Sequence, residues 1–137
     1  MSPYEAHQKY KNTQIETANQ EKLLIMMYNG AIKFAKQAIR GIENNDYELT
    51  NNTLTRTQAI IIELQATLDH NTGGEISENL DALYDYMKRR LAQANVNKDK
   101  EPINEVIDML KELKSTWIEA SKQLKSSQQD NKVSVKA

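Results

Sequence analysis

The stretch from residue 76 to residue 95 constrains the fold of this chain more than any other. Its apolar residues recur at intervals of three and four, the period of a helix that is buried along one face. They are Ile76, Leu80, Leu83, Tyr84, Met87, Leu91 and Ala94. Charged residues occupy the other side, and Asp85 precedes Arg89 by one turn in the order that stabilises a helix. Because such a helix needs other helices to cover its apolar face, the stretch predicts a helical bundle.

Three further segments have the same helical period, at roughly residues 19–43, 46–70 and 99–125. Asn19 and Asp99 are suitable N-caps, and the connections are short and rich in Asn, Asp and Gly. The inner face of the last helix is expected to carry Ile103, Val106, Ile107, Leu110, Leu113, Trp117 and Leu124. The sequence therefore predicts an all-α fold, an antiparallel four-helix bundle with an N-terminal arm and a disordered C-terminal tail.

The predicted bundle, residues 19–125, has an extension at each end. Residues 1–18 show little periodicity and form either a frayed arm or an arm that docks Tyr10 and Ile15 onto the body. Residues 126–137 have no apolar face and are expected to be disordered. Gly30 lies inside the first helix, where glycine costs about 1 kcal/mol relative to alanine, which indicates a close approach by another backbone.

The overall charge excludes several classes of partner. With 18 basic and 19 acidic residues the net charge is −1, so there is no large positive field to hold a nucleic acid or an anionic membrane. There is no cysteine, no secretion signal and no apolar run of the roughly 20 residues that a membrane span needs. A cytoplasmic single-domain protein is expected.

The chain offers little for catalysis. The histidines are His7 and His70, and neither belongs to the Glu-x-x-His pairs of a di-metal bundle. No phosphate-binding loop or nucleophile motif is present, so we expect neither a cofactor, nor a metal, nor enzymatic activity. A phosphate-accepting role for His70 is the alternative from another class, although a surface histidine is the simpler interpretation.

Apolar residues exceed what one face of each helix can bury. Residues 23–28 are apolar throughout, and Met26 projects roughly 145° from the centre of the core face, among lysines. Ile62 points roughly 120° away from the core face of its helix. It is bordered by the small side chains of Thr55, Ala59 and Ala66. Such a smooth row suits a second helix, which would be a partner's, while a wider core or a homodimer are the alternatives. The pattern does not assign Ile60, Tyr84 and Tyr86 to the core or to the groove.

Residues 76–95 also resemble the signature helix of the flagellin export chaperones, the FliS family. The resemblance is carried by Leu83-Tyr84-Asp85-Tyr86-Met87, followed by Arg89-Arg90-Leu91 and Ala94-Asn95. Supporting matches are Leu23, Met26, Met27, Tyr28, Gly30, Ala31, Ile32 and Phe34, with Tyr10, Ile15, Thr17 and Ala18 before them and Glu105, Val106 and Trp117 after them. The resemblance covers about residues 10–120, and it departs from the family at Asn19-Gln20, where a Ser/Thr-Pro pair is usual.

This resemblance implies a chaperone that binds the disordered C-terminal segment of flagellin in the cytoplasm, where the segment becomes helical. Binding would prevent premature polymerisation and support delivery to the flagellar export apparatus. The family's N-terminal arm is thought to lie over part of the groove, a role that falls on Tyr10 and Ile15 here. The residues expected to bind the partner are Tyr10, Ile15, Met26, Thr55, Ala59, Ile62 and Ala66.

Overall fold

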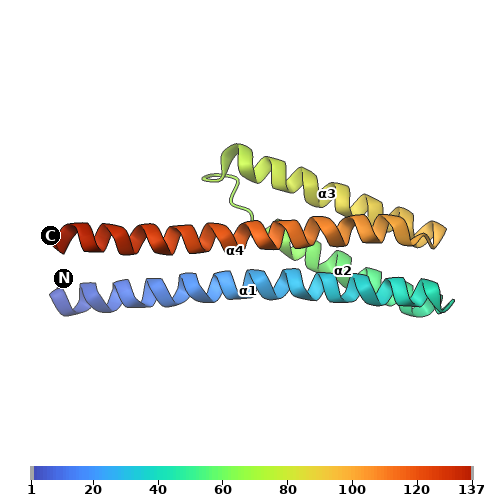
Figure 1. Ribbon diagram of the computed structural model, residues 1–137, viewed down its shortest axis with the longest axis horizontal. Coiled ribbons are helices and arrows are strands. Elements are labelled where there is room, and N and C mark those ends of the chain that lie inside the picture. The colour runs from blue at the N-terminus through green and yellow to red at the C-terminus, as the bar shows by residue number, and fades with distance from the viewer. Residues whose placement is uncertain (1, 137) are drawn as a thin grey trace.

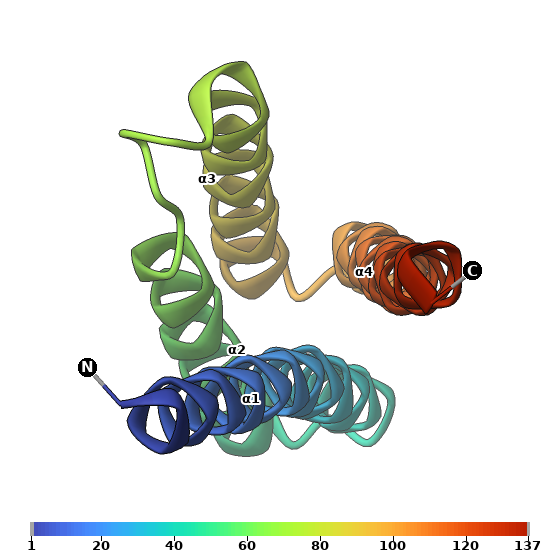
Figure 2. The same cartoon turned by 90° about the vertical axis from the view of Figure 1, so that its left-hand side faces the viewer.

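The computed structural model describes residues 2–136, without the side chains of residues 13, 14, 17, 18 and 127–136. Its helices are α1 (Pro3–Glu43), α2 (Tyr47–Ala66), α3 (Gly74–Asn97) and α4 (Lys100–Lys136). Helix α1 packs against α2 and α4, and α3 packs against the same two helices, so the four close into a ring (Figure 2). Successive helices run in opposite directions (Figure 1). The predicted antiparallel four-helix bundle is confirmed.

The helices differ greatly in length. Helices α1 and α4 contain 41 and 37 residues, whereas α2 and α3 contain 20 and 24. Figure 1 shows α1 and α4 running in the same plane of view with both chain termini at one end, and Figure 2 shows that the two helices diverge toward those termini. Helices α2 and α3 accompany them only over the half that is distant from the termini. One half of the molecule is therefore a four-helix bundle, and the other is a projecting pair of helices.

Helix α1 begins at Pro3, so the predicted start at Asn19 is wrong. The Ser2 hydroxyl accepts a hydrogen bond from the Glu5 amide at 3.2 Å, and the Glu5 carboxylate accepts one from the Ser2 amide at 3.3 Å. This reciprocal pair is a capping box, and proline is favoured directly after the cap. The residues expected to form an arm are therefore the first part of a continuous helix, which does not fold back over the bundle.

Two helix ends also differ from expectation. Helix α2 stops at Ala66 instead of His70, because the Thr67 hydroxyl bonds to the Leu64 carbonyl and Asp69 accepts bonds from the amides of Asn71 and Thr72. Helix α4 continues to Lys136, where a disordered tail was expected from residue 126. Neither glycine nor proline follows Pro102, so no residue in the sequence stops a helix once it has formed. The predicted cap at Asp99 is confirmed by its 3.0 Å bond from the Glu101 amide.

Gly41 allows α1 to lie very close to the turn that connects it to α2. A Cβ placed on Gly41 would lie 2.8 Å from the Asp46 carbonyl oxygen and 2.4 Å from the Thr50 hydroxyl. At Gly30, where the sequence suggested such an approach, a Cβ would meet only the end of the Ile60 side chain, at 3.3 Å. The expectation of a neighbouring backbone at Gly30 is wrong.

The core lies entirely in the four-helix half. Its largest fully buried side chains are Tyr28, Tyr84, Leu54, Ile61, Leu64, Met87, Leu91, Ile103 and Leu110. Two residues that were expected inside are exposed, Ile76 by 70% and Leu124 by 56%. The first turn of α3 diverges from α1 and α4, and the end of α4 extends past α2 and α3, so neither side chain has a helix to cover it.

Candidate partner-binding surface

The outer side of α2 carries a smooth row of exposed side chains. Thr55, Ala59, Ile62 and Ala66 follow one another at helical steps and are all exposed, Ile62 by 54%. The neighbouring positions Ile61 and Leu64 are fully buried. The row therefore lies on the face of α2 directed away from the core. Three of its four side chains are small, so another helix could approach this backbone closely.

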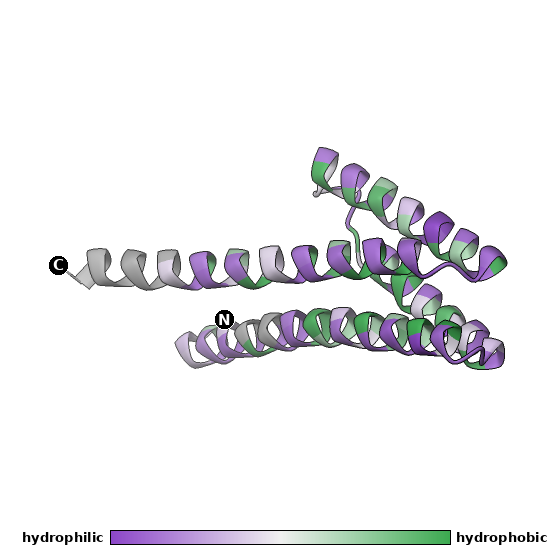
Figure 3. Ribbon diagram, turned by 45° about the vertical axis from the view of Figure 1, so that its right-hand side comes forward, coloured by the Kyte–Doolittle hydropathy of each residue, from purple (hydrophilic) through white to green (hydrophobic). Residues whose placement is uncertain are grey.

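A second apolar group lies on α1, beside the junction with α2. Met26 is 63% exposed, and Leu23, which was not among the predicted binding residues, is 57% exposed. Met26 lies one helical turn before Gly30. At Gly30, α1 is close to α2, because a Cβ placed there would contact the Ile60 side chain. We call Leu23, Met26, Thr55, Ala59, Ile62 and Ala66 together the α1–α2 face. Figure 3 shows the apolar residues of α1 concentrated in its middle section.

Tyr10 and Ile15 lie on the projecting part of α1. They are 51% and 59% exposed. Helix α2 does not extend alongside this part of α1, so the structure does not bring the two residues onto the row of Ile62. An arm folded over the α2 row is not observed, because the capping box starts a continuous helix upstream of both residues.

Tyr84 belongs to the core and not to the surface. Its hydroxyl is 2.5 Å from that of Tyr28, and the Trp117 indole nitrogen donates to the Tyr28 oxygen at 3.0 Å. Burial raises the pKa of both tyrosines above its ordinary value. The group ties α1, α3 and α4 together where the four-helix half ends. Ile60 is half-buried and packs against the core.

Tyr86 is half-buried and joins α3 to α4. Its hydroxyl donates to the Glu105 carboxylate, which also accepts from the Arg90 Nε at 3.0 Å. These two donors, Tyr86 first, hold the pKa of Glu105 below its usual value. Tyr86 and Arg90 of the signature helix thus connect α3 to α4, and the Glu105 carboxylate is occupied by these two hydrogen bonds.

Asp81 and Asp85, which belong to the charged side of residues 76–95, contact α2. The Gln65 side-chain amide donates to Asp81 at 3.0 Å and to Asp85 at 2.9 Å, and Lys88 lies 3.2 Å from Asp85. The bond from Gln65, supported by Lys88, lowers the pKa of Asp85. The pair therefore fastens α2 to α3.

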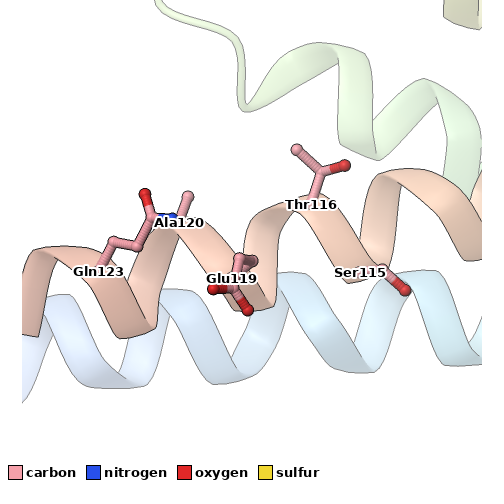
Figure 4. A pocket seen from close by; sticks show the side chains of 5 residues that line it. All are labelled: Ser115, Thr116, Glu119, Ala120 and Gln123. Carbon is pink, nitrogen blue, oxygen red and sulfur yellow. The ribbon is translucent and has the colours of Figure 1, made fainter.

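An open hollow on α4 does not have the character of a ligand site. It is lined by the exposed residues Ser115, Thr116, Glu119, Ala120 and Gln123. In Figure 4 these side chains point in different directions and do not converge. Among the described residues, no group of three or more His, Cys, Asp or Glu could hold a metal ion. His70 is exposed in the α2–α3 connection.

Membrane-spanning character was searched along the part of the chain that the structure describes. None of the helices there is both long and apolar enough to cross a membrane.

A four-helix bundle with an uncovered apolar face on two adjacent helices is typical of helical protein-binding modules. The model of the family "Flagellar protein FliS" matches residues 3–124. The "Flagellar secretion chaperone FliS" of Bacillus subtilis is 40% identical over 119 residues, which cover 87% of this chain and 86% of the relative. That of Campylobacter jejuni is 37% identical over 114 residues, covering 83% and 89%.

A solved structure described as a flagellar chaperone from bacteria has the same fold. It superimposes with a TM-score of 0.75 at 20% identity, covering 89% of this chain and 99% of the other. The chain belongs to the FliS family of flagellar secretion chaperones.

Proposed function

We propose that this protein is a cytoplasmic chaperone that binds the disordered C-terminal segment of flagellin on the α1–α2 face. The bound segment becomes helical, is prevented from polymerising prematurely, and is passed to the flagellar export apparatus. The protein acts by binding alone and catalyses no reaction. Membership of the FliS family and the names of its relatives support the flagellar role.

The observation that carries the proposal is the uncovered apolar surface. Met26 and Ile62 are both more than half exposed, and Ile62 directly follows the fully buried Ile61. A disordered client loses conformational entropy on binding, so it needs a large apolar area in compensation. Burial of about 1,000 Å² at about 25 cal/mol per Å² gives roughly 25 kcal/mol before the losses from ordering and association.

Tyr10 and Ile15 extend the proposed surface along α1. Both are exposed on the same helix as Met26, toward the N-terminal end. A client helix longer than α2 would pass beyond the α1–α2 face and reach this part of α1. In this arrangement Ile15, which points in nearly the same direction as Met26, contacts the client directly, whereas Tyr10 points roughly 160° away from Met26 and would be contacted only by a client that wraps around α1. Neither residue acts as a cover.

The test is a calorimetric titration of the variant Ile62→Asp with the C-terminal segment of flagellin from the same bacterium. We expect at least about a 10-fold loss of affinity, because an aspartate in the middle of the row would be buried without a partner. Far-ultraviolet circular dichroism and the melting temperature should be unchanged, since Ile62 touches solvent.

Val96→Asp is the matched control. Val96 is 83% exposed on α3 and lies outside the α1–α2 face, so its replacement should leave the affinity within about 2-fold of the original protein. Equal affinities for the two variants would refute the site. Light scattering of the protein alone tests the other use of this face, because a stable homodimer that Ile62→Asp dissociates would mean that a second copy covers it.

A further inference from the structure

The outermost face of α1 carries a regular series of large exposed side chains. Tyr4, Ile15 and Met26 follow one another at intervals of eleven residues and are 75%, 59% and 63% exposed. Eleven residues make three helical turns and about 16.5 Å of helix, so the three side chains point in nearly the same direction. This series exists only because α1 begins at Pro3 and is continuous through Glu43.

Lysines follow the same interval on the same face. Lys11, Lys22 and Lys33 alternate with the three apolar residues, and all are exposed. Among the residues whose side chains are described, none forms an ion pair with these lysines. We call Tyr4, Lys11, Ile15, Lys22, Met26 and Lys33 the basic strip.

The positive charge of the strip is local. On a regular helix the strip spans roughly 60° of the surface opposite the core, and Lys36 and Arg40 continue it. The acidic residues of α1 lie outside this sector. They are Glu5, which caps the helix, Glu21, which pairs with Lys125 of α4 at 3.8 Å, Glu16 and Glu43. Since the whole chain has a net charge of −1, the strip is a concentration of one sign on one helix.

We propose that the basic strip binds an acidic amphipathic helix, and that this helix is part of the flagellin segment held on the α1–α2 face. The proposal rests on the function proposed above, and Met26 is common to the two surfaces. A helix lying along α1 would bury apolar residues against Tyr4, Ile15 and Met26 and place carboxylates beside the lysines. Charge complementarity of this kind selects the partner and its register and accelerates association.

An anionic membrane is the less suitable partner for this strip. A helix that lies in a membrane interface has a broad, continuous apolar face. Here single apolar residues are separated by three turns and alternate with lysine, which matches contact with another helix better than insertion among lipids.

The test compares two charge-reversed proteins in titrations with the same C-terminal flagellin segment. One carries Lys11→Glu, Lys22→Glu and Lys33→Glu on the strip. The matched control carries Lys100→Glu, Lys111→Glu and Lys122→Glu, which changes three exposed lysines of α4 and gives the same net charge. At low salt the strip variant should bind at least about 10-fold more weakly than the control variant, with a slower association rate, and 0.5 M NaCl should reduce the difference.

The possible outcomes separate this inference from the proposed function. If the unaltered protein does not bind the segment, the proposed function fails, and this inference fails with it. If it binds, and both reversed variants bind equally well, only the strip is refuted. Binding of the unaltered protein to phosphatidylglycerol vesicles, lost in the strip variant while flagellin affinity stays constant, would also refute it and assign the strip to a membrane. Circular dichroism of both variants verifies that the helices remain folded.

Discussion

The two halves of α1 and α4 lie in different environments. In the four-helix half, α1 buries Tyr28, Ala31, Ala35 and Ala38 completely. In the projecting half, the described side chains of α1 before residue 21 are all exposed, and α4 has no buried residue after Leu110 within the described part of the chain. The difference arises because α2 and α3 are roughly half as long as α1 and α4. Stability is therefore concentrated in one half, and the other is available for binding.

The largest expected effect separates the halves directly. Leu91→Ala removes a fully buried side chain from the four-helix half and should lower the free energy of unfolding by about 2–5 kcal/mol. Leu124→Ala makes the same chemical change in the projecting half, at a side chain that is 56% exposed, and should cost less than about 0.5 kcal/mol. Urea denaturation measures both. Similar losses at the two positions would show that the projecting pair has a core of its own.

The next effect concerns how α1 meets α2. Gly41→Ala should destabilise the protein by about 1–3 kcal/mol, since the new methyl group would collide with the Asp46 carbonyl and the Thr50 backbone. Gly30→Ala meets only the mobile end of Ile60, and alanine favours the helix by about 1 kcal/mol, so its net effect should stay within about 0.5 kcal/mol. Thermal unfolding of the two variants tests this contrast. A larger loss at Gly30 than at Gly41 would contradict it.

The smallest effect compares one ion pair from each half. Glu105 bonds to Tyr86 and Arg90 between α3 and α4, whereas Glu21 pairs with Lys125, which is 68% exposed. Glu105→Gln should lower the melting temperature at neutral pH, and Glu21→Gln should not change it measurably.

The Glu105 effect should also depend on pH. The folded protein holds the pKa of Glu105 below its value of 4.5 in the unfolded chain, so the contribution is complete above that value and is lost as the pH falls through the folded pKa. The difference between Glu105→Gln and the original protein should therefore shrink below about pH 4.5. A difference that stays constant from pH 7 to pH 3 would contradict this account.

The sequence predicted the exposure of a site residue correctly where that exposure depends on the direction of the side chain on its own helix. Met26 and Ile62 point away from the apolar face of their own helices, and both are exposed. Leu23 belongs to the same apolar run as Met26, so its exposure could have been anticipated from that run. The basic strip was not predicted from the sequence, because it depends on where α1 begins. Its eleven-residue interval becomes visible only when α1 starts at Pro3, a start that the Ser2-Pro3-Tyr4-Glu5 capping box indicates in the sequence.

The sequence by itself determined the helices, most of their inner faces and the family, because helical period and capping depend on residues within a few turns of one another. The tertiary structure decided which apolar side chains find a neighbour. Ile76 has the period of a core residue and yet is 70% exposed, while Gly41 has no local signal and yet lies against the Asp46 carbonyl. Both outcomes depend on where other helices end and cross, and burial is set by those distances rather than by the local pattern.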